Sequence, residues 1–187
     1  MSRARLVAGG ILLAGAVAEA SMSAARNERR RATFEAAVKR SVATGRKLVV
    51  VGDPRAGLHT RFLPAYDCGE LCVDLAGCPL CPESVAADIT QPLDLPDDSA
   101  VVFVSCVLEY VSDVKAALNN LERVAGSPDN LFTVFVDPLS VTAFLYPGAS
   151  QRVGDEKGAS WHKVTTAQKL IVGGVISALA VATIVKR

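Results

Sequence analysis

Residues 49–57, VVVGDPRAG, decide the fold of this chain. A run of β-branched residues leads here into a glycine-bearing turn, which is the usual start of a nucleotide-binding βαβ unit. The run begins at Lys47 and is apolar without alternation, as expected of a strand that is covered on both faces of a parallel sheet. Pro54 and Arg55 are unusual in such a turn, because it normally needs small and flexible residues.

The segments around this turn alternate between strand and helix patterns. Apolar residues at helical spacing predict an amphipathic helix over residues 33–45, ended by Gly45. Three further strands are expected to end near Asp74, Asp88 and Ser105, and a fourth to lie within residues 130–138. A second helix is expected over residues 58–65, and a third from an N-cap at Ser112 to Gly126. The sequence therefore predicts an α/β protein with a Rossmann-like, mostly parallel sheet and helices on both of its faces, plus one or two hydrophobic terminal helices.

Length and composition limit the function classes. With 187 residues, the chain has room for one ordinary domain and appendages. Its formal net charge is +1 and 5% of its residues are aromatic, which argues against nucleic acid as a partner, because nucleic acids select basic and aromatic surfaces. The chain is 50% hydrophobic, and the apolar excess lies at its two ends.

The first 25 residues allow three interpretations, since they are apolar from Leu6 to Ala18 after two arginines. A retained membrane anchor is favoured, because a basic run at residues 26–31 follows the apolar stretch directly. Positively charged residues beside a membrane helix stay on the cytoplasmic face, which disfavours export of the rest of the chain. A cleavable signal peptide that ends in Ala18-Glu19-Ala20 and an ordinary buried helix are the alternatives. Residues 26–46 are then a basic flank followed by an amphipathic helix.

The C-terminal segment, residues 169–187, is predicted to be a transmembrane helix. It carries no charge from Leu170 to Val185 and is bracketed by basic residues. A helix of this length spans about 24 Å against a hydrocarbon core of about 30 Å, and the flanking lysines can make up the difference. A buried core helix is the alternative. Residues 154–168 are polar and are expected to link this helix to the main domain, on the cytoplasmic side of the membrane.

The middle of the chain carries a series of motifs in a characteristic order. They are the glycine turn, an acid that closes the second strand, Asp88-Ile89 after the third, Leu95-Pro96, Asp97-Asp98-Ser99 before the fourth, and Val107-Leu108-Glu109-Tyr110-Val111 after it. This order resembles that of the class I S-adenosylmethionine-dependent methyltransferases, over residues 47–138. The resemblance implies a methyltransferase-like Rossmann domain over residues 47–153.

The resemblance also implies a set of cofactor-binding residues. Gly52, Asp53 and Gly57 match the turn that passes close to the methionine part of S-adenosylmethionine. Asp74 matches the acid that accepts hydrogen bonds from the ribose hydroxyls, as a carboxylate can. Asp88 and Ile89 match the pair at the adenine, and Ser105, followed by Cys106, would line the mouth of the pocket.

Several positions depart from the family pattern. Val50 stands where the family usually has an acid, and Pro54 and Ala56 replace the second and third glycines of its turn. Proline removes a backbone donor at the point of cofactor approach. Tyr110 replaces a frequent histidine after the fourth strand, which removes a plausible base, and no final antiparallel strand pair is evident after residue 138.

These departures predict a membrane-anchored, catalytically inactive methyltransferase-like protein with a structural or scaffolding role. Its expected partners are a membrane and the other proteins of a membrane assembly or virion, with no cofactor and no catalytic residue. The alternative is an active S-adenosylmethionine-dependent methyltransferase that acts on a small molecule or lipid at a membrane.

Four cysteines form a C-x3-C-x5-C-x2-C cluster at Cys68, Cys72, Cys78 and Cys81, and Cys106 stands alone. Free or structural thiols are the favoured interpretation, because such residues pack well in a cytosolic core. A zinc site is the first alternative, since the last pair has the spacing of a zinc knuckle. Disulfides are the second and need an oxidising compartment.

Overall fold

The computed structural model describes residues 3–56, 64–136, 150–153 and 160–163. The chain divides into two compact units, one formed by Arg26–Val136 and the other by Met1–Ala25 together with Asp137–Arg187. The first unit contains the sheet and every described residue of the candidate site.

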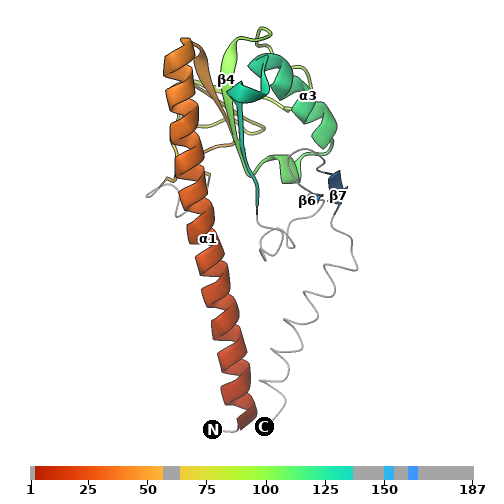
Figure 1. The fold of residues 1–187 in the computed structure, drawn as a ribbon. Coiled ribbons are helices and arrows are strands. Elements are labelled where there is room, and N and C mark those ends of the chain that lie inside the picture. The colour runs from red at the N-terminus through yellow and green to blue at the C-terminus, as the bar shows by residue number, and fades with distance from the viewer. Residues whose placement is uncertain (1–2, 57–63, 137–149, 154–159, 164–187) are drawn as a thin grey trace. The chain divides into compact units, whose positions relative to one another are not determined.

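The unit Arg26–Val136 is built on a five-stranded parallel sheet (Figure 1). Its strands are β1 (Lys47–Val51), β2 (Leu71–Asp74), β3 (Ser84–Ala86), β4 (Ala100–Ser105) and β5 (Leu131–Val134), in the spatial order β3-β2-β1-β4-β5. The prediction of an α/β fold with a parallel sheet is confirmed. The order reverses between β1 and β4, which makes this pair the topological switch point, where open α/β sheets usually bind ligands.

Helices cover both faces of the sheet. Helix α1 (Arg3–Thr44) packs Phe34, Ala37 and Val38 against a buried cluster that includes Phe103 of β4. Helix α3 (Val114–Ala125) contacts β4 and β5 on the opposite side, as Figure 1 shows. Every residue of β4 is buried, which accounts for its unbroken apolar run.

Capping residues fix the ends of the helices. Helix α1 is followed by Gly45 at φ +66°, as predicted, because a left-handed residue here favours glycine. Helix α3 begins at the predicted place, but its cap is Asp113 and not Ser112. The Asp113 side chain accepts the backbone N–H of Ala116 at 3.0 Å, and Ser112 lies one residue too early for this bond. Short 3-10 helices, η1 (Leu108–Tyr110) and η2 (Pro128–Asn130), follow β4 and precede β5.

The other unit contains a hairpin that the sequence analysis did not predict. Strands β6 (Ser150–Val153) and β7 (Ser160–Lys163) pair antiparallel and form a separate two-stranded sheet. This pair is a sheet of its own and does not extend the five-stranded sheet, as the final strand pair of the family does, and β7 lies in the segment that was expected to be a polar linker. The two strands are mostly polar and do not alternate between apolar and polar residues, which is the pattern that predicts a strand. Their pairing through backbone groups could therefore not be predicted from the sequence.

The predicted membrane segments fall largely outside this description. Helix α1 runs unbroken through the expected boundary between residues 1–25 and 26–46. Among the residues that the structure describes, no helix is both long and apolar enough to cross a membrane. Residues 169–187 and most of the expected helix over residues 58–65 lie outside the described residues.

Candidate functional site

The candidate site lies at the carboxyl ends of β1 and β4, which are neighbours with Val51 opposite Val104. After β1 the chain turns at Gly52, with φ +96°, and after β4 it turns at Cys106, with φ +55°. Two turns with positive φ therefore meet at the switch point of the sheet, where the resemblance places the methyl donor.

Gly52 is covered by side chains of the same chain. A Cβ atom at this position would lie 2.6 Å from Cγ2 of Val107 and 3.9 Å from the hydroxyl of Tyr66. Val107 follows β4 and packs directly on the α-carbon of the glycine. The open face that a glycine gives to a ligand is thus filled by an apolar side chain.

Tyr66 closes the same region from a second direction. Its hydroxyl donates to the carbonyl oxygen of Gly52 at 3.5 Å, and its ring centroid lies 5.0 Å from that of Phe103 and 6.1 Å from that of Phe34. Burial raises the pKa of Tyr66 to about 12, so the phenol stays neutral at physiological pH. The ring is held by packing and is not poised as an acid or base.

Arg30 of α1 occupies the end of β4. Its Nε donates to Oγ of the buried Ser105 at 2.9 Å, and its Nη1 donates to Asn27 Oδ1 at 3.2 Å. Ser105, predicted to line a pocket mouth, is therefore bonded to a guanidinium. Sequence reasoning missed Arg30, because it lies 75 residues from Ser105 and reads as part of a solvated basic run.

Glu109 is a buried carboxyl beside this arginine, with 3% of its surface exposed. The backbone N–H of Val136 donates to its Oε1 at 2.5 Å, whereas Oε2 has no hydrogen-bond partner among the described residues. Burial raises the pKa of Glu109 to about 7, and the positive charges of Arg30 and Arg26 oppose the rise. The family motif around Glu109 was recognisable from the sequence, but the burial of its carboxyl was not.

Cys106 is the one free cysteine among the described residues and lies in the same group. Burial raises the pKa of its thiol, and the charge of Arg30 partly counters this. A thiol that stays protonated is a poor nucleophile, so Cys106 is not an activated cysteine.

The turn at Gly52 and Asp53 lies beside Asp74, in line with the resemblance. The carboxylates of both aspartates, however, accept hydrogen bonds from backbone N–H groups of the neighbouring turns. Asp74 accepts the N–H of Asp53 at 3.2 Å through Oδ2 and the N–H of Ala76 at 3.0 Å through Oδ1. Asp53 accepts the N–H of Arg55 at 2.8 Å. These bonds fix the loops after β1 and β2, and they use one lone pair on each of three carboxylate oxygens.

The remaining predicted residues are less closely joined to this group. Asp88 is exposed, and its Oδ1 accepts the N–H and the hydroxyl of Thr90 at 2.9 and 2.8 Å. Ile89 is 4% exposed and belongs to the core, while its carbonyl accepts Asn120 Nδ2 at 3.0 Å. Gly57 lies outside the described residues.

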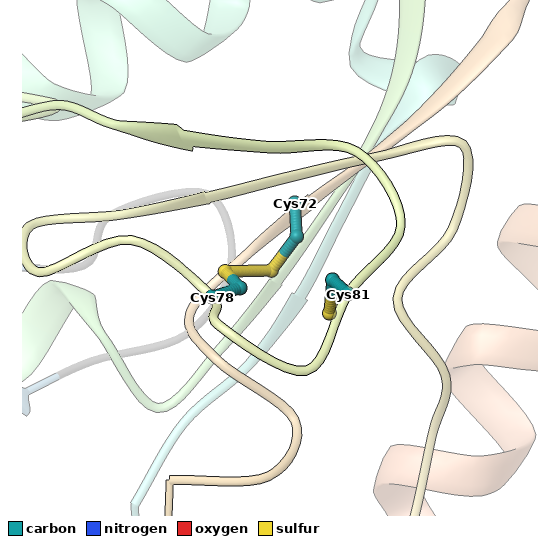
Figure 2. Close-up of side chains that lie close together, drawn as sticks. All are labelled: Cys72, Cys78 and Cys81. Carbon is teal, nitrogen blue, oxygen red and sulfur yellow. A yellow bond between two sulfur atoms is a disulfide. The ribbon is translucent and has the colours of Figure 1, made fainter.

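The cysteine cluster lies on β2 and the loops beside it. Disulfides join Cys68 to Cys81 and Cys72 to Cys78, and Figure 2 shows the second of these with Cys81 next to it. The favoured expectation of free thiols is therefore wrong for this structure. The loops on both sides of β2 bring the four residues to one place, which the spacing alone did not determine.

Comparison of the chain with family models, with curated proteins and with solved structures finds no match. The arrangement of the candidate site therefore carries the functional argument. It combines a filled glycine turn, a neutral phenol, a buried carboxyl and a protonated thiol, none of which is exposed as a reactive group.

Proposed function

We propose that the unit Arg26–Val136 is a methyltransferase-like domain without catalytic activity, which has a structural or scaffolding role in a membrane assembly or virion. The observation that carries this proposal is the packing of Val107 on Gly52. A cofactor could approach this glycine only if Val107 and Tyr66 moved away, and Tyr66 is held by two aromatic rings.

Charge supports the same proposal. S-adenosylmethionine carries its reactive methyl group on a positively charged sulfonium. Arg30 lies at the end of β4 on Ser105, and its charge acts on Tyr66, Cys106 and Glu109 as well. Like charges repel strongly where water is excluded, so this guanidinium disfavours a sulfonium at the same place.

The turn itself gives little help to a ligand. Pro54 is buried and has no backbone N–H, and the Arg55 N–H is already bonded to Asp53. Two donors that a binding loop would aim at a ligand are therefore missing or used. The turn supports its own conformation.

Attachment to a membrane is part of the proposal and rests on the sequence. Residues 169–187 are long and apolar enough, with basic ends, to form an anchor, and the apolar start of the chain is a second candidate. The basic run at residues 26–31 favours the cytoplasmic side for the main domain, where the two disulfides would be reduced. A protein of this kind would use its surface to hold other proteins of the assembly.

An active S-adenosylmethionine-dependent methyltransferase remains the alternative. The observation in its favour is that Gly52, Asp53 and Asp74 meet at the ends of β1 and β2, with Asp74 only partly buried. Each oxygen of Asp74 keeps a lone pair that could accept a ribose hydroxyl.

Calorimetric titration of S-adenosylmethionine into the full chain tests between the two. We expect a dissociation constant no lower than about 1 mM, which corresponds to a binding free energy of at most about 4 kcal/mol. The Asp74→Ala variant is the matched control and should give the same trace. Micromolar binding by the natural chain that disappears in Asp74→Ala would overturn the proposal and support the enzyme.

A flotation experiment tests the C-terminal anchor. We expect the full chain to float with phosphatidylcholine vesicles and the variant Val175→Lys/Leu179→Lys to remain in the soluble fraction, since each lysine costs about 3 kcal/mol in the middle of a membrane helix. Val42→Lys is the control, because Val42 is already 78% exposed on α1. Equal flotation of the double-lysine variant would show that residues 169–187 are not needed for attachment and would assign the anchor to the apolar start of the chain.

A further inference from the structure

The cysteine cluster brings four sulfur atoms to one place. The Sγ atoms of Cys72, Cys78 and Cys81 lie within 4.8 Å of one another, and Cys68 is bonded to Cys81. Cys72 and Cys78 are fully buried, and Cys68 is 4% exposed. A group this compact can hold a small ion, provided that its thiols are not joined to each other.

The loop between β2 and β3 holds two of these residues in a defined turn. Gly77, with φ +75°, donates its N–H to the carbonyl of Asp74 at 3.0 Å and redirects the chain after β2. Cys78 donates its N–H to Ser84 Oγ at 2.6 Å, and the N–H of Cys81 bonds to the carbonyl of Cys78 at 3.0 Å. The turn is therefore fixed by hydrogen bonds that do not involve sulfur.

Zinc fits this geometry better than other common metals. Thiolates are soft ligands, and Zn–S bonds of about 2.3 Å in a tetrahedron place the sulfurs about 3.8 Å apart. The three Sγ atoms lie within 4.8 Å of one another, so once the Cys72–Cys78 bond is reduced, small side-chain movements suffice to reach this separation. Four cysteines leave no coordination position for water, which is typical of a structural site and not of a catalytic one.

We propose that the reduced chain binds one Zn²⁺ through Cys68, Cys72, Cys78 and Cys81. The ion links the loops on both sides of β2 to each other and to the strand, as the two disulfides do in the oxidised chain. The same sulfurs cannot serve both states, so oxidation and metal binding exclude each other. This inference goes beyond the structural role proposed above and does not depend on it.

The two states are related by a balanced reaction. Each disulfide takes two electrons and two protons from a dithiol reductant, which is itself oxidised to a disulfide, and its S–S bond breaks to give two thiols. One Zn²⁺ then displaces the four thiol protons as four Zn–S bonds form. A reducing compartment favours the zinc state, in line with a domain on the cytoplasmic side.

Cobalt titration of the full chain tests this site. The chain is reduced with tris(2-carboxyethyl)phosphine, which lacks competing thiols, freed of metal and titrated with Co²⁺. We expect one Co²⁺ per chain with the visible and charge-transfer absorption of a tetrahedral thiolate site, and full displacement by one Zn²⁺. The oxidised chain should show no such absorption.

Variants locate the ligands. Cys81→Ser should bind Co²⁺ more weakly and with a smaller charge-transfer band, because three thiolates remain, whereas Cys81→His should bind one metal ion through the same three thiolates with histidine as the fourth ligand. Cys106→Ser should match the natural chain. The proposal is overturned if the reduced natural chain shows no metal-thiolate absorption, or if the oxidised chain or Cys81→Ser binds equally well. These results are independent of whether S-adenosylmethionine binds.

Discussion

Replacement of Gly52 by alanine is expected to lower the free energy of unfolding by about 4 kcal/mol, from backbone strain and overpacking together. The backbone at this position has φ +96°, which alanine adopts only under strain. Its methyl group would also lie 2.6 Å from Cγ2 of Val107, closer than carbon atoms can approach without displacement. Urea unfolding of the natural chain and the variant measures the difference.

A matched control separates the two causes. Gly45 also has a positive φ, +66°, but a Cβ atom there meets no atom within 4 Å. Gly45→Ala should therefore show backbone strain alone, at about 1–2 kcal/mol. Adding Val107→Ala to Gly52→Ala should recover part of the lost stability, because the smaller side chain leaves room. If Gly52→Ala is no worse than Gly45→Ala, Val107 does not fill the space above Gly52.

Glu109→Gln is expected to remove a pH dependence of stability. The folded-state pKa of Glu109 is about 7, above its ordinary value of 4.5, so the folded chain holds this proton more tightly than the unfolded chain. The stabilisation is complete below pH 4.5 and is lost as the pH rises through 7. Across this window the loss amounts to about 3 kcal/mol.

Glutamine isolates this effect, because its amide oxygen can still accept the N–H of Val136 and it carries no charge at any pH. Urea midpoints between pH 5 and pH 8 should fall for the natural chain relative to Glu109→Gln. Glu122→Gln on the exposed face of α3 is the control and should follow the natural chain. Parallel curves for the natural chain and Glu109→Gln would contradict the burial of an ionisable carboxyl at this position.

Local signals in the sequence were sufficient for most of the sheet. The unbroken apolar runs of β1 and β4 gave their positions, and Gly45 and Gly126 marked the helix ends as the structure has them. The hairpin of β6 and β7 was missed because polar strands carry no such pattern. The N-cap of α3 was predicted at Ser112, one residue before the actual cap at Asp113, since serine and aspartate are both good caps.

The candidate site could be predicted only in part. Gly52, Asp53 and Asp74 follow strands, and the ends of parallel strands meet, so their proximity was predictable. Arg30 and Tyr66 could not be placed, because their contacts depend on how α1 and the loop before β2 pack. The pairing of the cysteines depends in the same way on loop conformation and on redox state.

The most direct test of a filled site is a nuclear Overhauser measurement on the full chain in detergent micelles, with and without S-adenosylmethionine. We predict a strong Overhauser effect between the Val107 methyl groups and the Gly52 α-protons, with no change in either resonance when the cofactor is added. Loss of this effect together with shifts of the Gly52 amide on addition of S-adenosylmethionine would show that Val107 moves away for the cofactor, which would contradict a filled site and favour the active methyltransferase.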